Sequence, residues 1–224
     1  APSPRLAEVF SGHKGPVTSL AFRPSTLRLF SASSDRCLRQ IGLEEMTTIE
    51  TLYGHQAPVS GVSCPPRRDR PISCGRDRTL RAWKLEEESH LIYRPGGDAS
   101  GAECVACLSD DAFLSGHEDG SLRLWRAEKR KPVATAKEAH GRGGGVPRGV
   151  AALSALPNGD LAVTGSCDGY LRLWRVDAAS KPRTKSGSGP NKKAVATLEE
   201  IARIPVPGYV NSVQLGPAGK FLVA

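Results

Sequence analysis

The chain has 224 residues, of which 39% are hydrophobic and 24% charged, and its formal net charge is +8. This composition is typical of a globular domain, and no apolar run approaches the roughly 18 residues that a membrane-spanning helix needs. Six cysteines in a chain of this length do not form the dense pattern of a disulfide framework, so we expect a reduced intracellular compartment.

Four similar segments follow one another along the chain. They read SASSDRCLRQI (31–41), SCGRDRTLRAW (73–83), SGHEDGSLRLW (115–125) and TGSCDGYLRLW (164–174). Their aspartates lie 42, 42 and 49 residues apart, and each is preceded by Ser or Thr at −4 and followed by Leu-Arg at +3 and +4. Such phased similarity indicates a repeat architecture in which each repeat is one supersecondary unit.

Each repeat predicts four short β-strands. In the first repeat, the alternating runs VTSLAF and LRLFSAS precede the aspartate, the L-R-x-W-like run follows it after a tight turn, and TIETLYGH comes last. Four strands in about 42 residues match one blade of an all-β propeller. The final IPVPGYVNSVQLGPAGKFLVA adds two strands of a fifth blade. We therefore expect residues 1–224 to be a segment of one propeller domain, about four and a half blades long, with the missing blades outside this chain.

A buried hydrogen-bond network is expected in each blade. Antiparallel pairing brings the loop before the first strand and the turn after the second strand to the same end of the blade. There the aspartate can bind a histidine, which binds the Ser or Thr hydroxyl, which accepts from the Trp indole. The first network lacks Trp at position 41, and Gly96-Gly97 replaces Gly-His in the third. The expected members are His13, Ser31 and Asp35; His55, Ser73, Asp77 and Trp83; Ser115, Asp119 and Trp125; and His140, Thr164, Asp168 and Trp174.

Several apparent catalytic motifs are better explained by the repeat. A Ser-His-Asp set that recurs in successive repeats indicates a scaffold, so we expect no catalytic residue, cofactor or metal. Cys104 and Cys107 form a CxxC within a predicted strand, where residues three apart point to opposite faces and cannot share a metal. The arginine of each L-R-x-W run is expected to pack on the side chain two residues later rather than on a ligand: Arg39, Arg81, Arg123 and Arg172.

The repeats resemble the WD40 family. The resemblance is carried by the Gly-His before the first strand and by the aspartate that precedes Trp by six positions. None of the four repeats ends in the Trp-Asp dipeptide of the family, because Lys84, Arg126 and Arg175 follow the three tryptophans. That dipeptide's aspartate lies outside the expected network, so its loss leaves the fold prediction intact.

Longer stretches resemble the WD40 proteins of the U3 small nucleolar ribonucleoprotein. They are LYGHQAPVSGVS, SCGRDRTLRAWKLEEESHLIY, EAHGRGGGVPRGVAALSALPNGDLAVTGS and the final IPVPGYVNSVQLGPAGKFLVA. The resemblance implies a complete propeller of seven blades, with two blades before this segment. It also implies binding of U3 small nucleolar RNA at its box B/C element, beside a kink-turn-binding protein and other small-subunit processome proteins. The site of action would be the nucleolus within the nucleus, and the role pre-rRNA processing in small-subunit ribosome biogenesis, with no membrane and no small-molecule substrate.

The excess positive charge is unevenly distributed. Residues 181–193 (KPRTKSGSGPNKK) hold five basic residues and no acidic one, so 177–194 is interpreted as a basic flexible insertion between the third and fourth strands of a blade. This insertion is longer and more basic than the resemblance implies. The end with the aspartate turns is expected to bind RNA, with Arg76 as the strongest contact and these residues as the site: Lys14, Arg36, Arg76, Arg78, Arg142 and Arg148.

Two alternatives remain open from the sequence. The opposite end of the blades is also basic, through Arg67, Arg68, Arg70, Lys129, Arg130 and Lys131. The arginine turns would also suit an acidic peptide. The second functional hypothesis is therefore a WD40 scaffold that binds peptides, such as an adaptor in a ubiquitin ligase or a chromatin complex.

Overall fold

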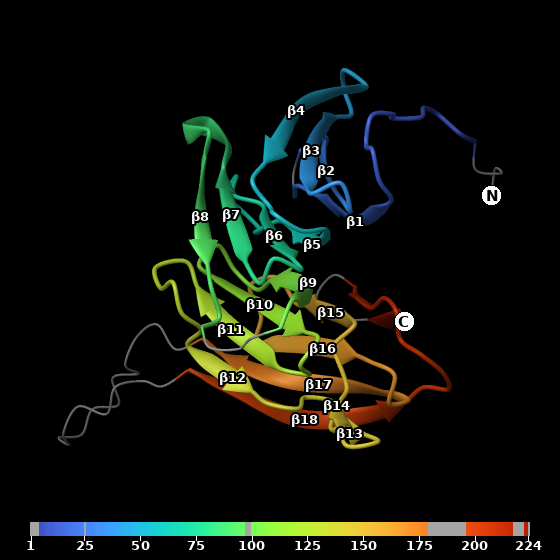
Figure 1. Ribbon diagram of the computed structural model, residues 1–224, viewed down its shortest axis with the longest axis vertical. Helices are drawn as coiled ribbons and strands as arrows, with labels where there is room; N and C mark the ends of the chain where they lie inside the picture. Colours follow the sequence, from blue (N-terminus) through green and yellow to red (C-terminus); the bar gives the residue numbers. More distant parts are fainter. Residues whose placement is uncertain (1–4, 25, 97–99, 179–195, 217–221, 224) are drawn as a thin grey trace.

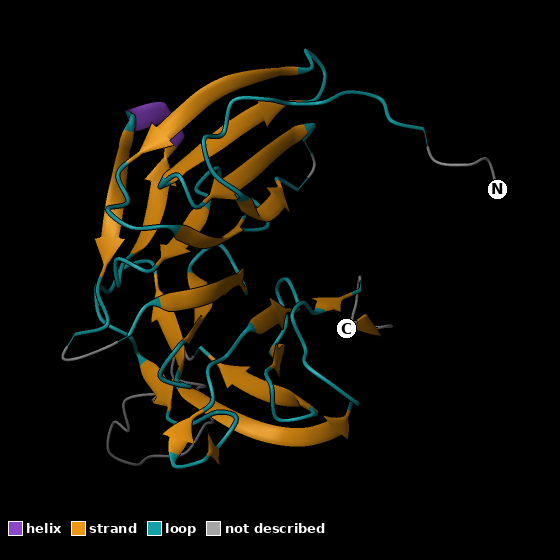
Figure 2. Cartoon of the chain, turned by 45° about the vertical axis from the view of Figure 1, so that its right-hand side comes forward, coloured by secondary structure: helices purple, strands orange, loops and turns teal. Residues whose placement is uncertain are grey.

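The computed structural model describes residues 5–24, 26–96, 100–178, 196–216 and 222–223. Four antiparallel sheets follow one another along the chain, each made of four consecutive strands, and together they form an arc (Figures 1 and 2). The expected all-β architecture of four-stranded blades is confirmed. In the described part of the chain the only helix is a 3-10 turn, η1 (Leu85–Glu87), and no helix there has the length and apolar character to cross a membrane.

The strands are assigned to blades in chain order. Blade 1 contains β1 (Val17–Phe22), β2 (Arg28–Ser33), β3 (Cys37–Gly42) and β4 (Thr47–Tyr53). Blade 2 contains β5 (Val59–Ser63), β6 (Ile72–Gly75), β7 (Leu80–Lys84) and β8 (Ser89–Tyr93). Blade 3 contains β9 (Ala102–Cys107), β10 (Ala112–His117), β11 (Leu122–Arg126) and β12 (Ala134–Ala136). Blade 4 contains β15 (Ala152–Ala155), β16 (Leu161–Gly165), β17 (Tyr170–Asp177) and β18 (Thr197–Pro205).

Two further strand pairs lie outside these blades. The hairpin of β13 (Arg142–Gly143) and β14 (Val146–Pro147) lies in the long loop before blade 4. The pair of β19 (Gln214–Leu215) and β20 (Leu222–Val223) supplies the two expected strands of a fifth blade. The basic insertion 177–194 begins at the end of β17 and precedes β18, the third and fourth strands of blade 4, and its residues 179–194 lie outside the described residues.

The position of a strand within its blade decides its sequence pattern. β10 is buried at all six positions and reads AFLSGH, because blades pack on both of its faces. The outer strand β18 is mostly exposed and reads TLEEIARIP, with Glu and Arg interspersed among apolar residues. The short apolar runs of the sequence are therefore inner strands, and the charged runs are outer strands.

The first strands of neighbouring blades lie side by side, so that β1, β5, β9 and β15 line the concave side of the arc. A side chain on each strand bonds a backbone carbonyl of the next blade. The Thr18 hydroxyl donates to Val59 O at 2.7 Å, and the Ser60 hydroxyl donates to Ala102 O at 2.8 Å. These bonds connect positions about one repeat apart and fix the register between blades.

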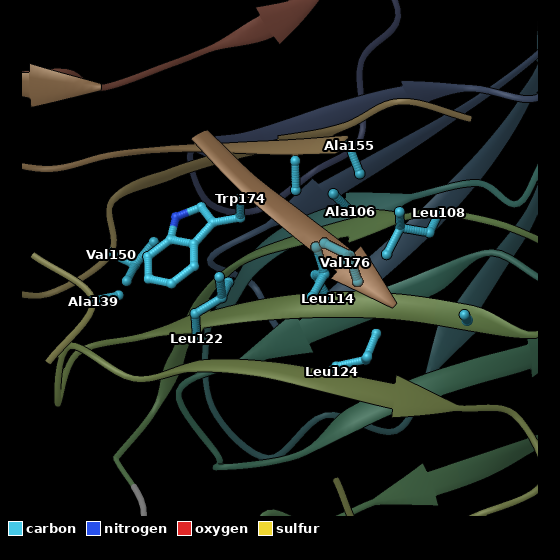
Figure 3. Packing of buried hydrophobic residues seen from close by; sticks show 12 residues of the cluster. Ala106, Leu108, Leu114, Leu122, Leu124, Ala139, Val150, Ala155, Trp174 and Val176 are labelled. Carbon is cyan, nitrogen blue, oxygen red and sulfur yellow. The ribbon is translucent and has the colours of Figure 1, made fainter. Parts of the chain in front are cut away.

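Each Trp of a third strand packs on the preceding blade. Trp83 belongs to a cluster with Phe30, Leu38 and Leu52 of blade 1. Trp174 packs with Leu122 and other residues of blade 3 (Figure 3). Since burying a large apolar side chain contributes about 1.5–3 kcal/mol, the repeated Trp holds neighbouring blades together.

Blade 1 has one uncovered face in the described part of the chain. Val17, Leu20 and Phe22 of β1 are 51%, 59% and 65% exposed. On the corresponding strand of blade 2, Val59 and Val62 are buried against blade 1. The inner strand of a blade is thus buried only where another blade packs beside it.

Candidate nucleic-acid interface

Blade 2 contains a complete network of buried polar side chains. His55 Nδ1 lies 2.9 Å from Asp77 Oδ2, and His55 Nε2 lies 2.8 Å from Ser73 Oγ. The Trp83 indole donates to the same hydroxyl at 2.9 Å. A neutral imidazole that donates from Nδ1 and accepts from the hydroxyl at Nε2 satisfies every one of these groups.

The same arrangement recurs in blade 4. His140 lies 3.0 Å from Asp168 Oδ2 and 2.8 Å from Thr164 Oγ1, to which Trp174 donates at 2.9 Å. The long loop before β15 changes the spacing between histidine and aspartate from 22 to 28 residues without changing the contacts.

Blade 1 has the network without an indole. His13 lies 2.8 Å from both Asp35 Oδ2 and Ser31 Oγ. Ile41 occupies the Trp position and is 5% exposed. The apolar side chain is buried like the Trp of the other blades but cannot donate to Ser31.

Blade 3 differs from the sequence-based expectation. The Ser115 hydroxyl accepts from Trp125 at 2.8 Å and lies 2.8 Å from Nε2 of His117, which is fully buried within β10. His117 therefore supplies the imidazole that the preceding loop lacks. Asp119 instead accepts from the backbone and hydroxyl of Ser121 and pairs with Arg123 at 3.1 Å.

The network of blade 2 is almost completely buried. The side chains of His55 and Asp77 are 0% and 6% exposed, and Ser73 is fully buried. Burial alone would raise the pKa of Asp77, but its hydrogen bond and charge interaction with His55 hold that pKa well below the usual range. At neutral pH the ionised Asp77 carboxylate therefore accepts hydrogen bonds that stabilise the blade.

Ser73→Ala is expected to destabilise the protein by about 1–3 kcal/mol, because it leaves both the Trp83 indole and His55 Nε2 buried without a partner. Ser31→Ala is the matched control, since it removes the same hydroxyl where no indole depends on it, and His13 is slightly more exposed. Chemical unfolding should show the larger loss for Ser73→Ala. Equal losses would mean that the indole bond does not contribute.

The arginines of the third strands make hydrogen bonds and ion pairs. The Arg39 guanidinium donates to Ser11 O and Gly12 O, and Arg172 pairs with Asp168 at 2.9 Å. A Cβ added to Gly12 would lie 1.9 Å from Arg39 Nη1, so the Gly of the Gly-His leaves space for the guanidinium. In blade 4, Ala139 stands at the position of that glycine.

Cys104 and Cys107 lie on opposite faces of β9. Cys104 packs with the cluster between blades 3 and 4, whereas Cys107 belongs to the cluster between blades 2 and 3. Cys104 Sγ lies 3.3 Å from Val150 O, in the role that Thr18 and Ser60 have in the earlier blades. Burial raises the pKa of both thiols to about 12. Among the described residues no group of three or more His, Cys, Asp or Glu could hold a metal ion.

One end of the blades carries the leading loops before the first strands and the turns that contain the aspartates; we call it the Asp-turn face. Arg36 and Arg78 directly follow the aspartates of blades 1 and 2 and are exposed. Their φ angles are +73° and +61°, in the left-handed region. Gly120 and Gly169 occupy the same turn position in blades 3 and 4, with φ of +73° and +78°. Two blades therefore place an arginine where the backbone favours glycine.

Arg76 is also exposed, but its charge is partly compensated. Its guanidinium lies 3.4 Å from a Glu103 oxygen and 3.7 Å from a Glu118 oxygen. Burial and the hydrogen bond to Glu118 raise the pKa of Glu103, while Arg76 lowers it. The expected basic surface is thus interrupted by two acidic side chains beside Arg76, which come from β9 and from the turn of blade 3.

The remaining predicted contacts lie on leading loops. Arg142 is on β13 and pairs with Glu138 at 2.6 Å. Arg148 lies across the hairpin, where a Cβ on Gly143 would be 2.9 Å from its Nε. Lys14 is exposed, and its backbone N–H donates to Asp35. Within the part of the chain that the structure describes, Lys14, Arg36, Arg78 and Arg148 have no acidic side chain at ion-pair distance.

The opposite face is also basic, and it is paired to a similar extent. Arg68 pairs with Asp111 at 2.8 Å, and Arg70 lies 4.0 Å from Glu87. The backbone N–H groups of Arg67 and Arg68 both donate to Asp110. The acidic residues thus compensate part of the positive charge on this face, as Glu103, Glu118 and Glu138 do on the Asp-turn face.

Comparisons with known proteins agree with this architecture. The family model for the WD domain, G-beta repeat, matches residues 5–41, 46–84, 91–126 and 132–175. Two solved structures, described as "Structure of U3-55K" and "Crystal structure of RRP9 WD40 repeats", are each 33% identical, with a TM-score of 0.83. Each alignment covers 95% of this chain and 61% of the other, so this chain spans less than two thirds of those chains. No curated protein sequence matches significantly. From its repeats, its blades and these matches, the chain belongs to the WD40-repeat family.

Proposed function

We propose that this protein is a non-catalytic subunit of the U3 small nucleolar ribonucleoprotein. In this role it binds U3 small nucleolar RNA at the box B/C region, beside a kink-turn-binding protein, and serves pre-rRNA processing in the nucleolus. The observation that carries the proposal is the similarity to the U3-55K and RRP9 structures at 33% identity over 95% of this chain. A complete ring of seven blades belongs to the same proposal.

The turns of the Asp-turn face support an RNA partner. A non-glycine residue in the left-handed region costs roughly 1–2 kcal/mol, and such strain is more frequent at functional sites than elsewhere. Arg36 and Arg78 occupy this conformation, whereas the equivalent positions of blades 3 and 4 are glycine. Their guanidinium groups project from short turns without an acidic partner in the described residues, as phosphate recognition requires.

Arg36→Gly is expected to weaken binding of a box B/C RNA by about 1–3 kcal/mol and to lower the salt slope by about one unit, without lowering stability. Glycine is the residue that the same turn has in blades 3 and 4, so the fold tolerates it. Arg76→Ala is expected to weaken binding less, because Glu103 and Glu118 already compensate its charge. Affinity should be measured at several salt concentrations, with the kink-turn-binding protein present.

Lys131→Ala, an exposed change on the opposite face, is the control and should bind as the parent does. If Lys131→Ala loses affinity while Arg36→Gly does not, the assigned face is wrong. If the parent does not distinguish box B/C RNA from an unrelated RNA, or prefers an acidic peptide, a peptide-binding scaffold replaces the proposal.

A further inference from the structure

A pocket of about 380 Å³ opens on the Asp-turn face of blade 2. It lies between the Asp turn, which joins β6 to β7, and the segment that follows β8. Three of its lining residues are arginines and one is acidic, so the pocket carries an excess of positive charge. The lining residues are Gln56, Asp77, Arg78, Thr79, Arg81, Arg94, Pro95 and Gly96.

Both oxygens of the only carboxylate in the pocket lining already accept hydrogen bonds from the protein. Asp77 Oδ2 binds His55 and accepts from the backbone N–H of Gln56 at 3.0 Å. Asp77 Oδ1 accepts from the backbone and the hydroxyl of Thr79 at 3.1 and 2.7 Å. Arg78 and Arg94 at the rim are exposed, and within the described residues neither has an acidic side chain at ion-pair distance.

Arg81 adds a buried positive charge to the wall of the pocket. Its side chain is 7% exposed, its Nη1 lies 2.5 Å from His90 Nε2, and its Nη2 lies 3.9 Å from Asp77. Its Nε is buried and has no hydrogen-bond partner. Gly54 makes room for this arginine, since a Cβ there would lie 2.7 Å from Arg81 Nη1.

The electrostatic environment of Arg81 favours an added anion. Burial lowers the pKa of Arg81, Asp77 raises it, and the nearby charge of Arg94 lowers it again. His90 accepts from Arg81 as a neutral imidazole, because burial and the charge of Arg81 lower its pKa. An anion beside Arg94 would reduce the repulsion between the Arg94 and Arg81 guanidinium groups.

We propose that this pocket receives a single phosphate group of the RNA backbone, held by Arg78 and Arg94 over the buried charge of Arg81. The inference rests on the proposed function and adds Arg94, which the sequence did not single out. The lining includes no aromatic side chain on which a base could stack. Its only apolar side chain is Pro95, so it offers no recess for a peptide's apolar anchor. Guanidinium pairs match phosphate oxygens in geometry and charge.

The test combines protein and RNA changes on the intact protein with box B/C RNA. First, single phosphate linkages of the RNA are replaced one at a time by neutral methylphosphonate, and the linkages that weaken binding to the parent are identified. The same series is then measured with Arg94→Gln and with Arg78→Gly, which has the turn residue of blades 3 and 4. Lys131→Gln on the opposite face is the matched control.

Each pocket variant is expected to bind the unmodified RNA about 10-fold more weakly, with a salt slope smaller by about one unit. At one linkage, the same for both variants, methylphosphonate should weaken binding less than it does for the parent, because one of the two arginine contacts to that phosphate is already lost. Lys131→Gln should leave every linkage effect unchanged.

Other outcomes overturn the inference in distinguishable ways. If the parent binds RNA but Arg94→Gln and Arg78→Gly bind equally well, the pocket assignment fails and the proposed function stands. If both variants weaken binding but no single linkage is coupled to them, the arginines contribute only general charge, and the pocket holds no particular phosphate. If the parent does not bind the RNA, or an acidic peptide binds and depends on Arg94, the proposed function fails together with the pocket.

Discussion

Trp125→Ala is expected to destabilise the protein by about 3–5 kcal/mol, because it truncates the largest fully buried side chain of the described residues. The Trp125 ring stacks on Phe113 with ring centroids 6.1 Å apart, and it meets Tyr93 of blade 2 edge-on. Its removal leaves a cavity between blades 2 and 3 and deprives Ser115 of a donor. Equilibrium unfolding in urea, followed by circular dichroism, measures the loss.

Trp125→Phe separates packing from hydrogen bonding. The phenyl ring preserves most of the apolar contact but cannot donate to Ser115, so its cost is expected to be smaller, about 1–2 kcal/mol. If Trp125→Phe were as damaging as Trp125→Ala, the hydrogen bond rather than the packing would dominate. If Trp125→Ala were as stable as the parent, the Trp would not hold the blades together.

Acidification from pH 6.5 to pH 4 is expected to lower the free energy of unfolding by about 3 kcal/mol through His117 alone. Burial, and then the charge of Arg123, lower the pKa of His117 from 6.5 to about 4. The folded state therefore binds this proton less readily than the unfolded state does. The stability is fully present above pH 6.5, falls as the pH falls through this window, and reaches its lower limit below about pH 4.

His117→Gln tests this assignment, because the amide cannot ionise but can still accept from Ser115. Unfolding free energies measured from pH 7 to pH 4 should fall less steeply for the variant than for the parent. Some slope should remain, since burial also lowers the pKa of His140. Identical pH profiles for parent and variant would show that His117 does not carry the dependence. The pKa of Asp77 is lowered in the folded state, so Asp77 stabilises the protein at neutral pH, and most of this stabilisation is lost only at pH values below this range.

The blades could be predicted from the sequence because each rests on local, repeated signals. The aspartates at 35, 77, 119 and 168 mark the same turn in every blade, and Leu-Arg at fixed distance marks the strand that follows. The contacts of His55 with Ser73 and Asp77 follow from antiparallel pairing, which brings loops at one end of a blade together. The regular spacing of the repeated residues was sufficient to predict the blades and these contacts.

The structure differs from the sequence-based prediction at groups that do not recur at the same position in each repeat. His117 was missed because it lies inside a strand, two residues before Asp119, rather than in the loop before the first strand. The sequence Gly-His-Glu-Asp at 116–119 was the feature from which the role of His117 could have been predicted. Glu103 and Glu118 reach Arg76 from positions 27 and 42 residues away, so only the curvature of the arc brings the three together. The left-handed backbone of Arg36 and Arg78 could not be predicted from the sequence either. It is recognised from their φ angles, which match those of Gly120 and Gly169 at the same turn position.

The most direct test of the proposed function is a map of crosslinks between the intact protein and its RNA in cells. We expect crosslinks to the box B/C region of U3 small nucleolar RNA, in peptides that contain Arg36, Arg78 or Arg94 on the Asp-turn face. Fewer or none should fall on Lys129, Arg130 and Lys131. Crosslinks confined to the opposite face, or no enrichment of U3 small nucleolar RNA over other RNAs, would contradict it.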